Sequence, residues 1–168
     1  MNHDEDFSDY ASARWAALVR SSVILGCSPE EAKDLAQTAL LRCYANWRKV
    51  RRAENLDAYV YKVLLNCHRD SRRRHWWRER PTDVLPDRGT ADPTVDVDAS
   101  DAVQRAVAGL SEVNRQVVVL RYFAHLTEEQ TAAILGIPSG TVKSRMSRAL
   151  KQLATSAHLS DHAEGHKR

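Results

Sequence analysis

The sequence predicts an all-α protein of two small helical domains joined by a flexible linker. Apolar residues recur at helical spacing in both halves of the chain, and neither half shows the alternation typical of a strand. Between the halves, residues 80–100 contain three prolines and one glycine, which interrupt helices. These observations place one helical domain at residues 7–80, a linker at 81–100 and a second helical domain at 101–155.

The helices of the first domain are expected between capping and turn residues. An apolar stripe that begins at Phe7 is broken at residues 26–29. Ser28 is expected to cap the next helix, with Pro29 at its first position and acidic residues in its first turn. That helix should end in the basic segment 48–52, and a further helix should start near Asn55.

In the second domain, a helix is expected from about Asp101, and Ser111 is expected to cap the next one. The helix after Ser111, SEVNRQVVVLRYF, offers four apolar side chains to a core: Val117, Val118, Leu120 and Tyr122. The polar tail at residues 156–168 is expected to be disordered.

The stretch TEEQTAAILGIPSGTVKSRMSRAL contains two short helical patterns separated by a turn. Thr127 and Gln130 have the spacing of a capping box, which fixes the start of the first helix. Gly136 can end that helix in the left-handed conformation, and Pro138 prevents its continuation. Ser139 can cap the next helix. A tight turn between two short helices predicts a helix-turn-helix.

The second helix of this motif divides into an apolar face and a cationic face. Val142, Met146, Ala149, Leu150 and Leu153 are expected to pack inward. Small hydroxyls beside long cations on the other face suit a major groove, where Lys and Arg read guanine or bind phosphates. A solvated amphipathic helix is the commoner alternative. The absence of acidic residues from 130 to 160 favours DNA binding.

The distribution of charge indicates separate modules with separate partners. The net charge is only +3, but residues 66–80 contain six arginines, whereas residues 82–101 contain six aspartates and one arginine. Cys27, Cys43 and Cys67 form no CxxC pair, which favours reduced thiols over a disulfide framework or a zinc site. Without a secretory pattern or a long apolar run, a cytoplasmic protein with no membrane insertion is expected.

No catalytic site, metal site or cofactor is predicted, and the chain is not expected to be an enzyme. Paired carboxylates, a nucleophile–base set and a phosphate-binding loop are all missing from the sequence. His158, His162 and His166 recur every four residues, which on a helix would align metal ligands. Gly165 and the low apolar content of the tail favour frayed chain instead.

Several segments resemble extracytoplasmic-function (ECF) sigma factors of the sigma-70 family. LSEVNRQVVVLRYFAHLTEEQTAAILGIPSGTVKSRMSRAL is similar to their C-terminal promoter-reading domain. PEEAKDLAQTALLRCYANWRKV is similar to the helix that docks on the clamp helices of RNA polymerase. NLDAYVYKVLLNCHRDSRRRHWWRERP resembles the segment that melts and reads the −10 element. The resemblance covers residues 7–80 and 101–153, and WWRERPTDVLPD is closest to the SigE-type subgroup.

The resemblance implies a protein that binds core RNA polymerase, at the clamp helices and the flap of the large subunits, and promoter DNA. Such a chain directs promoter-specific initiation while the polymerase performs the chemistry. An anti-sigma factor is a further partner in many members, and whether this chain has one stays open. A helix-turn-helix regulator that acts without polymerase is the alternative. It explains residues 111–153 but leaves the two upstream segments without a role.

Matching by position assigns individual roles. The polymerase-binding candidates are Asp34, Leu35, Gln37 and Leu41. The −10 candidates are Tyr61, Lys62, Asn66, Arg69, Arg72, Arg73 and Arg74, with Asn66 offering its amide to a flipped-out base. The −35 candidates are Thr141, Lys143, Ser144, Arg145, Ser147, Arg148 and Lys151. For Trp76 and Trp77, stacking on bases and packing against the helical bundle both remain open.

Overall fold

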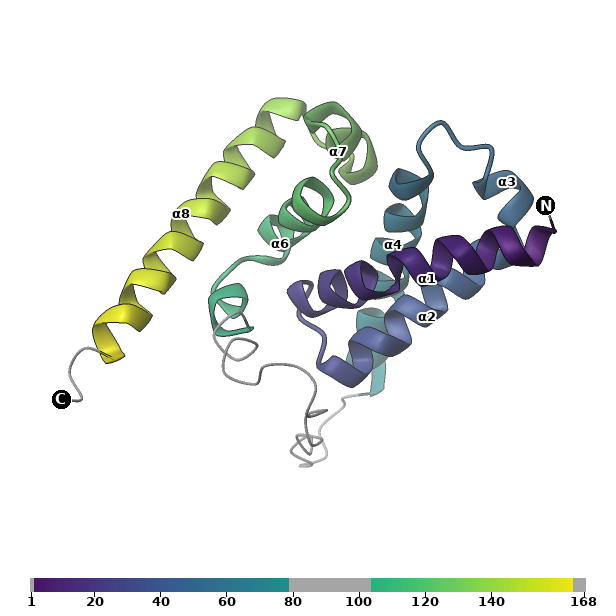
Figure 1. Cartoon of the computed structure of the whole chain (residues 1–168). Coiled ribbons are helices and arrows are strands. Elements are labelled where there is room, and N and C mark those ends of the chain that lie inside the picture. Colours follow the sequence, from purple (N-terminus) through teal and green to yellow (C-terminus); the bar gives the residue numbers. More distant parts are fainter. Residues whose placement is uncertain (1, 79–103, 165–168) are drawn as a thin grey trace. The chain divides into compact units, whose positions relative to one another are not determined.

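The computed structural model describes residues 2–78 and 104–164, with side chains up to Ser156, and these fold as two helical units (Figure 1). Every regular element in these two ranges is helical, which confirms the predicted all-α class. The expected linker at 81–100 lies outside the described residues. Each unit is therefore described by itself.

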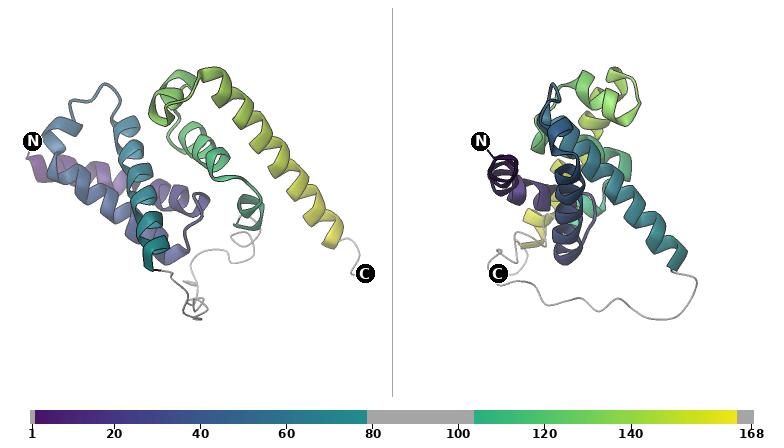
Figure 2. Two further views of the ribbon diagram at one scale, coloured as in Figure 1. Left: turned by 180° about the vertical axis from the view of Figure 1, so that it is seen from behind. Right: turned by 90° about the vertical axis from the view of Figure 1, so that its right-hand side faces the viewer.

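The first unit contains α1 (His3–Ile24), α2 (Pro29–Ala45), α3 (Trp47–Val50) and α4 (Leu56–Arg78). Helices α1 and α2 run antiparallel (Figures 1 and 2). Ser28 begins α2 with the predicted cap: its side chain accepts a hydrogen bond from Glu31 N at 3.3 Å, and the Glu31 carboxylate accepts one from Ser28 N at 2.8 Å. The expected continuation of this helix into residues 48–52 is wrong, because α2 ends at Ala45 and α3 follows separately.

The core of the first unit lies between α2 and α4, which pack along each other. Alanines on the inner face of α2 let the two backbones approach closely, and larger side chains of α4 fill the space beside them. The buried residues of this contact are Ala32, Ala36, Ala39, Leu40, Cys43, Val60, Leu64, Leu65 and Cys67.

Helix α1 is attached to this pair by aromatic rings and acidic side chains. The Phe7 ring lies 4.9 Å from that of Tyr44 and 5.2 Å from that of Trp47, centroid to centroid. The Trp47 indole donates a hydrogen bond to Asp6 at 3.1 Å, and the Tyr10 hydroxyl donates one to Asp57 at 2.8 Å. Burial, and then this hydrogen bond, raise the pKa of Tyr10, so its hydroxyl remains a donor to a higher pH than that of an ordinary tyrosine.

The buried thiol of Cys43 makes the stability of this unit sensitive to alkaline pH. Burial, and then the neighbouring Cys67, raise the pKa of Cys43 to about 12 from an ordinary value of about 9. The unfolded chain therefore loses its proton first, and the free energy of unfolding falls as pH rises from about 9 to about 12. We expect Cys43→Ala to show a shallower fall in denaturant titrations over this range. Ala36→Gly, equally buried but without a titrating group, should keep the wild-type slope.

The second unit contains α6 (Glu112–Val118), the π-helix η1 (Val119–Phe123), α7 (Glu128–Leu135) and α8 (Ser139–Glu164), preceded by helical residues 104–108. As predicted, Ser111 caps α6 by accepting a hydrogen bond from Asn114 N at 3.4 Å. Helices α6 and α7 both pack on α8. Their shared core includes Val117, Leu120, Leu126, Val142 and Ala149.

The π-helix η1 turns Tyr122 away from the core, against the expectation from helical spacing. Tyr122 is 61 % exposed, whereas Val119 and Leu120 are fully buried. A π-helical turn holds more residues than an α-helical turn, so a side chain late in the segment no longer follows the 3.6-residue stripe. The turn after η1 passes through His125 at φ 52° and is closed by a hydrogen bond from the Arg121 guanidinium to the Leu126 carbonyl.

The helix-turn-helix forms as predicted at the start of α7 and at the turn. Thr127 and Gln130 make the reciprocal capping box, at 2.9 and 3.1 Å, and Gly136 adopts the left-handed conformation at φ 65°. The prediction that Ser139 caps α8 is wrong. The carbonyl of Pro138 accepts the first hydrogen bonds, from Thr141 N at 3.0 Å and Val142 N at 3.2 Å, so Ser139 is already the first helical residue.

Helix α8 is longer than expected at its C-terminal end. The tail from residue 156 was predicted to be disordered, but α8 continues to Glu164. Alanine, leucine and the absence of proline permit this extension, and hydroxyls of Thr155 and Ser156 bond back to the helix at 2.9 and 3.0 Å. Residues 165–168 lie outside the described part of the chain.

Thr131 is a buried polar residue whose removal should stabilise the second unit. It is fully buried in α7, and its hydroxyl has no hydrogen-bond partner among the described residues. Because a buried unpaired hydroxyl is costly, we expect Thr131→Val to raise the free energy of unfolding by about 1 kcal/mol in chemical denaturation. The hydroxyl of Thr155 is exposed and hydrogen-bonded, so Thr155→Val should not raise the free energy of unfolding. A destabilised Thr131→Val variant would contradict this account.

Candidate nucleic-acid interface

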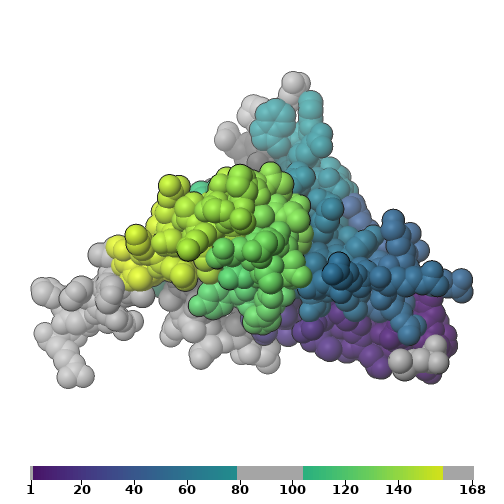
Figure 3. Space-filling model, turned by 90° about the horizontal axis from the view of Figure 1, so that it is seen from above, coloured from purple at the N-terminus to yellow at the C-terminus, as the bar shows by residue number. Residues whose placement is uncertain are grey.

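The second helix of the helix-turn-helix, α8, presents a cationic face at the surface of its unit. The fully buried Val142 and Ala149 define the opposite face, as predicted. Figure 3 shows α7 and the first turns of α8 at the surface of this unit. The exposed −35 candidates are Lys143, Ser144, Ser147, Arg148 and Lys151. Long cations interleaved with serines on a helix that follows a tight turn have the geometry of a major-groove reader.

Three other residues of α8 are placed on the flanks between the two faces. Thr141 and Arg145 are half-buried, and the Thr141 carbonyl accepts a hydrogen bond from the Ser144 hydroxyl at 3.1 Å. Leu150, which was expected inside, is 44 % exposed. At about 100° per residue it lies well round the helix from the direction between Val142 and Ala149, so only part of its side chain reaches the core.

The outer face of α4 carries most of the −10 candidates. Lys62, Asn66, Arg69 and Arg73 are exposed and recur at three- and four-residue intervals, so they form one stripe along the helix. Arg72 and Arg74 are exposed on either side of it. The inward face of α4 is apolar. Guanidinium groups along an exposed stripe favour phosphate contacts, and the Asn66 amide offers donors and an acceptor to a base edge.

Tyr61 is not part of this exposed stripe, although the sequence placed it among the −10 candidates. Its side chain is 2 % exposed, and its hydroxyl accepts a hydrogen bond from Ser21 at 3.3 Å. Burial raises its pKa. Residues adjacent in a helix point about 100° apart, so Lys62 faces solvent while Tyr61 supports the core. Tyr59, one turn before Lys62 and Val63, is half-buried.

The carboxyl end of α4 exposes two tryptophans. Trp76 and Trp77 are 71 % and 69 % exposed, and their rings meet edge to face with centroids 5.4 Å apart. In the part of the chain that the structure describes, neither ring packs into the bundle. Trp77 also lines a depression of about 330 Å³ together with Asp70, Arg73 and Arg74.

Asp70 and Arg42 lie beside the −10 candidates of α4, but they were not identified from the sequence as candidate site residues. The Arg42 guanidinium of α2 donates a hydrogen bond to Asp70 Oδ2 of α4 at 3.2 Å. The signal that could have found Asp70 is its position four residues after Asn66, on the same face of the helix.

Three of the four polymerase-binding candidates lie on the side of α2 that faces away from α4. Asp34, Gln37 and Leu41 are exposed, and Leu41, at 60 %, is a large apolar side chain in contact with solvent. Leu35 is buried in the core, so its role is structural packing. Tyr44 is 39 % exposed and donates a hydrogen bond to Asp4 at 2.8 Å.

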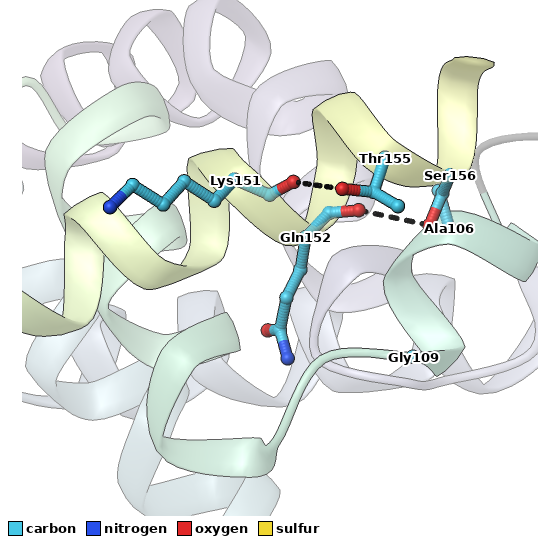
Figure 4. A pocket seen from close by; sticks show the side chains of 6 residues that line it. All are labelled: Ala106, Gly109, Lys151, Gln152, Thr155 and Ser156. Atoms are coloured by element: carbon cyan, nitrogen blue, oxygen red, sulfur yellow. Dashed lines mark hydrogen bonds between the residues drawn. The ribbon is translucent and has the colours of Figure 1, made fainter.

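A second depression, of about 330 Å³, lies where α8 passes residues 104–109 (Figure 4). Lys151, Gln152, Thr155 and Ser156 line it, and both hydroxyls are bonded to carbonyls of their own helix. Within the described ranges, no group of three His, Cys, Asp or Glu side chains is placed to hold a metal ion. The side chains of His158, His162 and His166 lie outside the described residues.

Comparison with known proteins identifies the family. The protein-family model described as Sigma-70 region 2 matches residues 6–78. The family model described as Sigma-70, region 4 matches residues 100–153. The chain belongs to the sigma-70 family. As a sigma factor of the ECF type, it binds core RNA polymerase and directs transcription initiation at promoters. The resemblance seen in the sequence is thereby confirmed, and the regulator that acts without polymerase is not supported.

Individual relatives agree with this assignment. The RNA polymerase sigma-E factor of Streptomyces avermitilis is 38 % identical over 160 residues, covering 91 % of this sigma factor and 87 % of the relative. The ECF RNA polymerase sigma factor SigM of Mycobacterium tuberculosis is 33 % identical over 129 residues, covering 74 % and 63 % of the two chains. A solved structure of the sigma factor RpoE with the anti-sigma factor NepR, from Bartonella quintana, matches with a TM-score of 0.74 at 25 % identity, covering 92 % of this chain and 98 % of RpoE.

In the residues described, no helix combines the length and apolar character needed to cross a membrane.

Proposed function

We propose that this sigma factor divides promoter recognition between three surfaces. Helix α8 reads the −35 element, the outer face of α4 reads and opens the −10 element, and the exposed side of α2 binds the clamp helices of the polymerase. The observation that supports the proposal best is the cationic face of α8, the second helix of a capped helix-turn-helix in a chain of the sigma-70 family.

The contributions of the −35 and −10 surfaces differ in their physical basis. On α8, Lys143 and Arg148 are long donors suited to guanine edges or phosphates. On α4, arginines neutralise phosphates, which makes binding fall steeply with salt. Asn66 bonds a base that has left the stack, and this offsets part of the few kcal/mol that unstacking costs. The sigma factor itself catalyses no reaction; the core enzyme forms the phosphodiester bonds.

Two further assignments rest on the relatives. We place the protein in the cytoplasm, where core polymerase works. The solved RpoE structure contains an anti-sigma factor. An anti-sigma factor that covers the polymerase-binding face of α2 would keep this chain from core polymerase.

Run-off transcription tests the proposal directly. Core RNA polymerase with the full chain should initiate at one position on a template carrying the gene's own upstream region, and core enzyme alone should not. Scrambling either the −35 or the −10 segment should remove the transcript. A chain that binds this DNA but neither binds core enzyme nor supports a transcript would contradict the proposal and favour a regulator acting without polymerase.

A further inference from the structure

Asp70 is a single carboxylate within the arginine-rich part of α4. Residues 69–74 contain four arginines and this one acid. A negative charge on a surface that meets phosphates weakens binding, since like charges repel over the few ångströms involved. Asp70 lies at the edge of the exposed stripe, on the side of Arg74; it is half-buried, four residues after Asn66 and three before Arg73. Its carboxylate therefore borders the face assigned above to the −10 element.

The ion pair between Arg42 and Asp70 contributes too little to the stability of the fold to explain why an acid lies at this position. The side chains of Arg42 and Asp70 are 46 % and 44 % exposed, and pairs of that exposure contribute on the order of 0–1 kcal/mol. The pair does fix the carboxylate. The hydrogen bond from Arg42, at 3.2 Å, engages Oδ2 and comes from a different helix, so it sets the direction in which Oδ1 faces.

Resting on the proposed role of α4 at the −10 element, we propose that Asp70 reads a cytosine there and that Arg42 is its positioning residue. A carboxylate only accepts hydrogen bonds, and in the major groove the N4 amino group of cytosine is the matching donor. The adenine amino group lies beside the N7 acceptor, which repels a carboxylate. The depression lined by Asp70, Arg73, Arg74 and Trp77 provides room for the edge of a base.

The helix also gives the approximate place of this cytosine. Asp70 follows Asn66 by four residues, a rise of roughly 6 Å along the helix axis. Successive base pairs of a duplex are separated by roughly 3.4 Å. The cytosine read by Asp70 is therefore about two base-pair steps along the duplex from the position where the base that meets Asn66 leaves the stack. Arg73 and Arg74, in the next turn, bind the phosphates beyond it.

Transcription from a randomised template pool tests the inference. Core polymerase with the full wild-type chain transcribes templates randomised across the −10 region, and the transcribed templates are sequenced. We expect one position at which cytosine is preferred roughly ten-fold. Asp70→Asn should erase this preference or turn it to adenine, at that position alone. Arg42→Gln should weaken the same preference, and Arg42→Lys should keep it. Arg73→Gln, the control, should lower transcription similarly from all templates.

The outcomes separate the possible roles. An unchanged base profile for Asp70→Asn, or an equal loss over all templates, would overturn the inference and leave a structural ion pair. A guanine preference that depends on Asp70 would also overturn it, because a carboxylate then binds the edge of an unpaired guanine. Thermal unfolding of each variant shows whether a loss reflects misfolding. If the wild type initiates nowhere specifically, the proposed function fails and this inference with it.

Discussion

Replacing Lys143 and Arg148 together by alanine should abolish transcription that depends on the −35 element, while the variant still binds core polymerase. Both side chains are exposed on the cationic face of α8. Each contact to a base edge or phosphate contributes about 1–3 kcal/mol, so removing the pair should cost roughly 30-fold or more in promoter affinity. The buried side of α8, with Val142 and Ala149, is untouched, and the fold should be retained.

Run-off transcription and co-elution with core enzyme measure the two effects separately. The salt dependence of promoter binding should also become shallower, because fewer counterions are released. Arg20→Ala with Arg52→Ala is the matched control: it removes the same charge from exposed positions of the other unit, outside the segments assigned to polymerase or DNA. Loss of core binding by the Lys143 and Arg148 variant, or full −35-dependent activity, would contradict the assigned role.

Leu41→Glu should weaken the binding of core polymerase at least about ten-fold and so silence every promoter equally. Leu41 is 60 % exposed beside Asp34 and Gln37, and burying a leucine at an interface contributes roughly 1.5–3 kcal/mol. A glutamate there loses this contribution and adds the cost of burying a charge. Because the side chain makes little contact with the core of its own unit, thermal stability should hardly change.

Two comparison variants make this result specific. Leu41→Met keeps the apolar contact and should bind nearly as wild type does. Ala13→Glu places the same charge on an exposed position of α1 and should bind normally. Fluorescence titration of labelled protein with core enzyme gives the affinities. Equal weakening by Ala13→Glu would show that net charge, and not the α2 surface, controls the association.

Local chemistry made the helix starts predictable, because capping is decided by a few neighbouring residues. Ser28, Ser111 and Thr127 cap as their sequences indicated, and Gly136 takes the left-handed conformation. Ser139 was predicted to be the cap of α8 but is its first helical residue, because the Pro138 carbonyl accepts the first hydrogen bonds of the helix. Spacing alone also predicted the two faces of α8, except that Leu150 is 44 % exposed.

Side-chain orientation in α4 and η1 could not be read in the same way. Family resemblance grouped Tyr61 with Lys62, yet which of two neighbours faces the core depends on where α1 and α2 lie. The π-helix at 119–123 breaks the 3.6-residue pattern that placed Tyr122 inside. The Arg42–Asp70 pair joins residues 28 positions apart, and only the packing of α2 on α4 brings them together.

The π-helix η1 also determines how this domain tolerates insertions and deletions. Its extra residue acts as an insertion that has already occurred between α6 and the helix-turn-helix. Deleting one residue from 119–123 would let α6 continue as a regular helix and would leave the later side chains close to their present directions. Leu120 and Leu126, which are now fully buried, could then stay in the core. This segment should therefore tolerate the deletion of one residue better than the insertion of another.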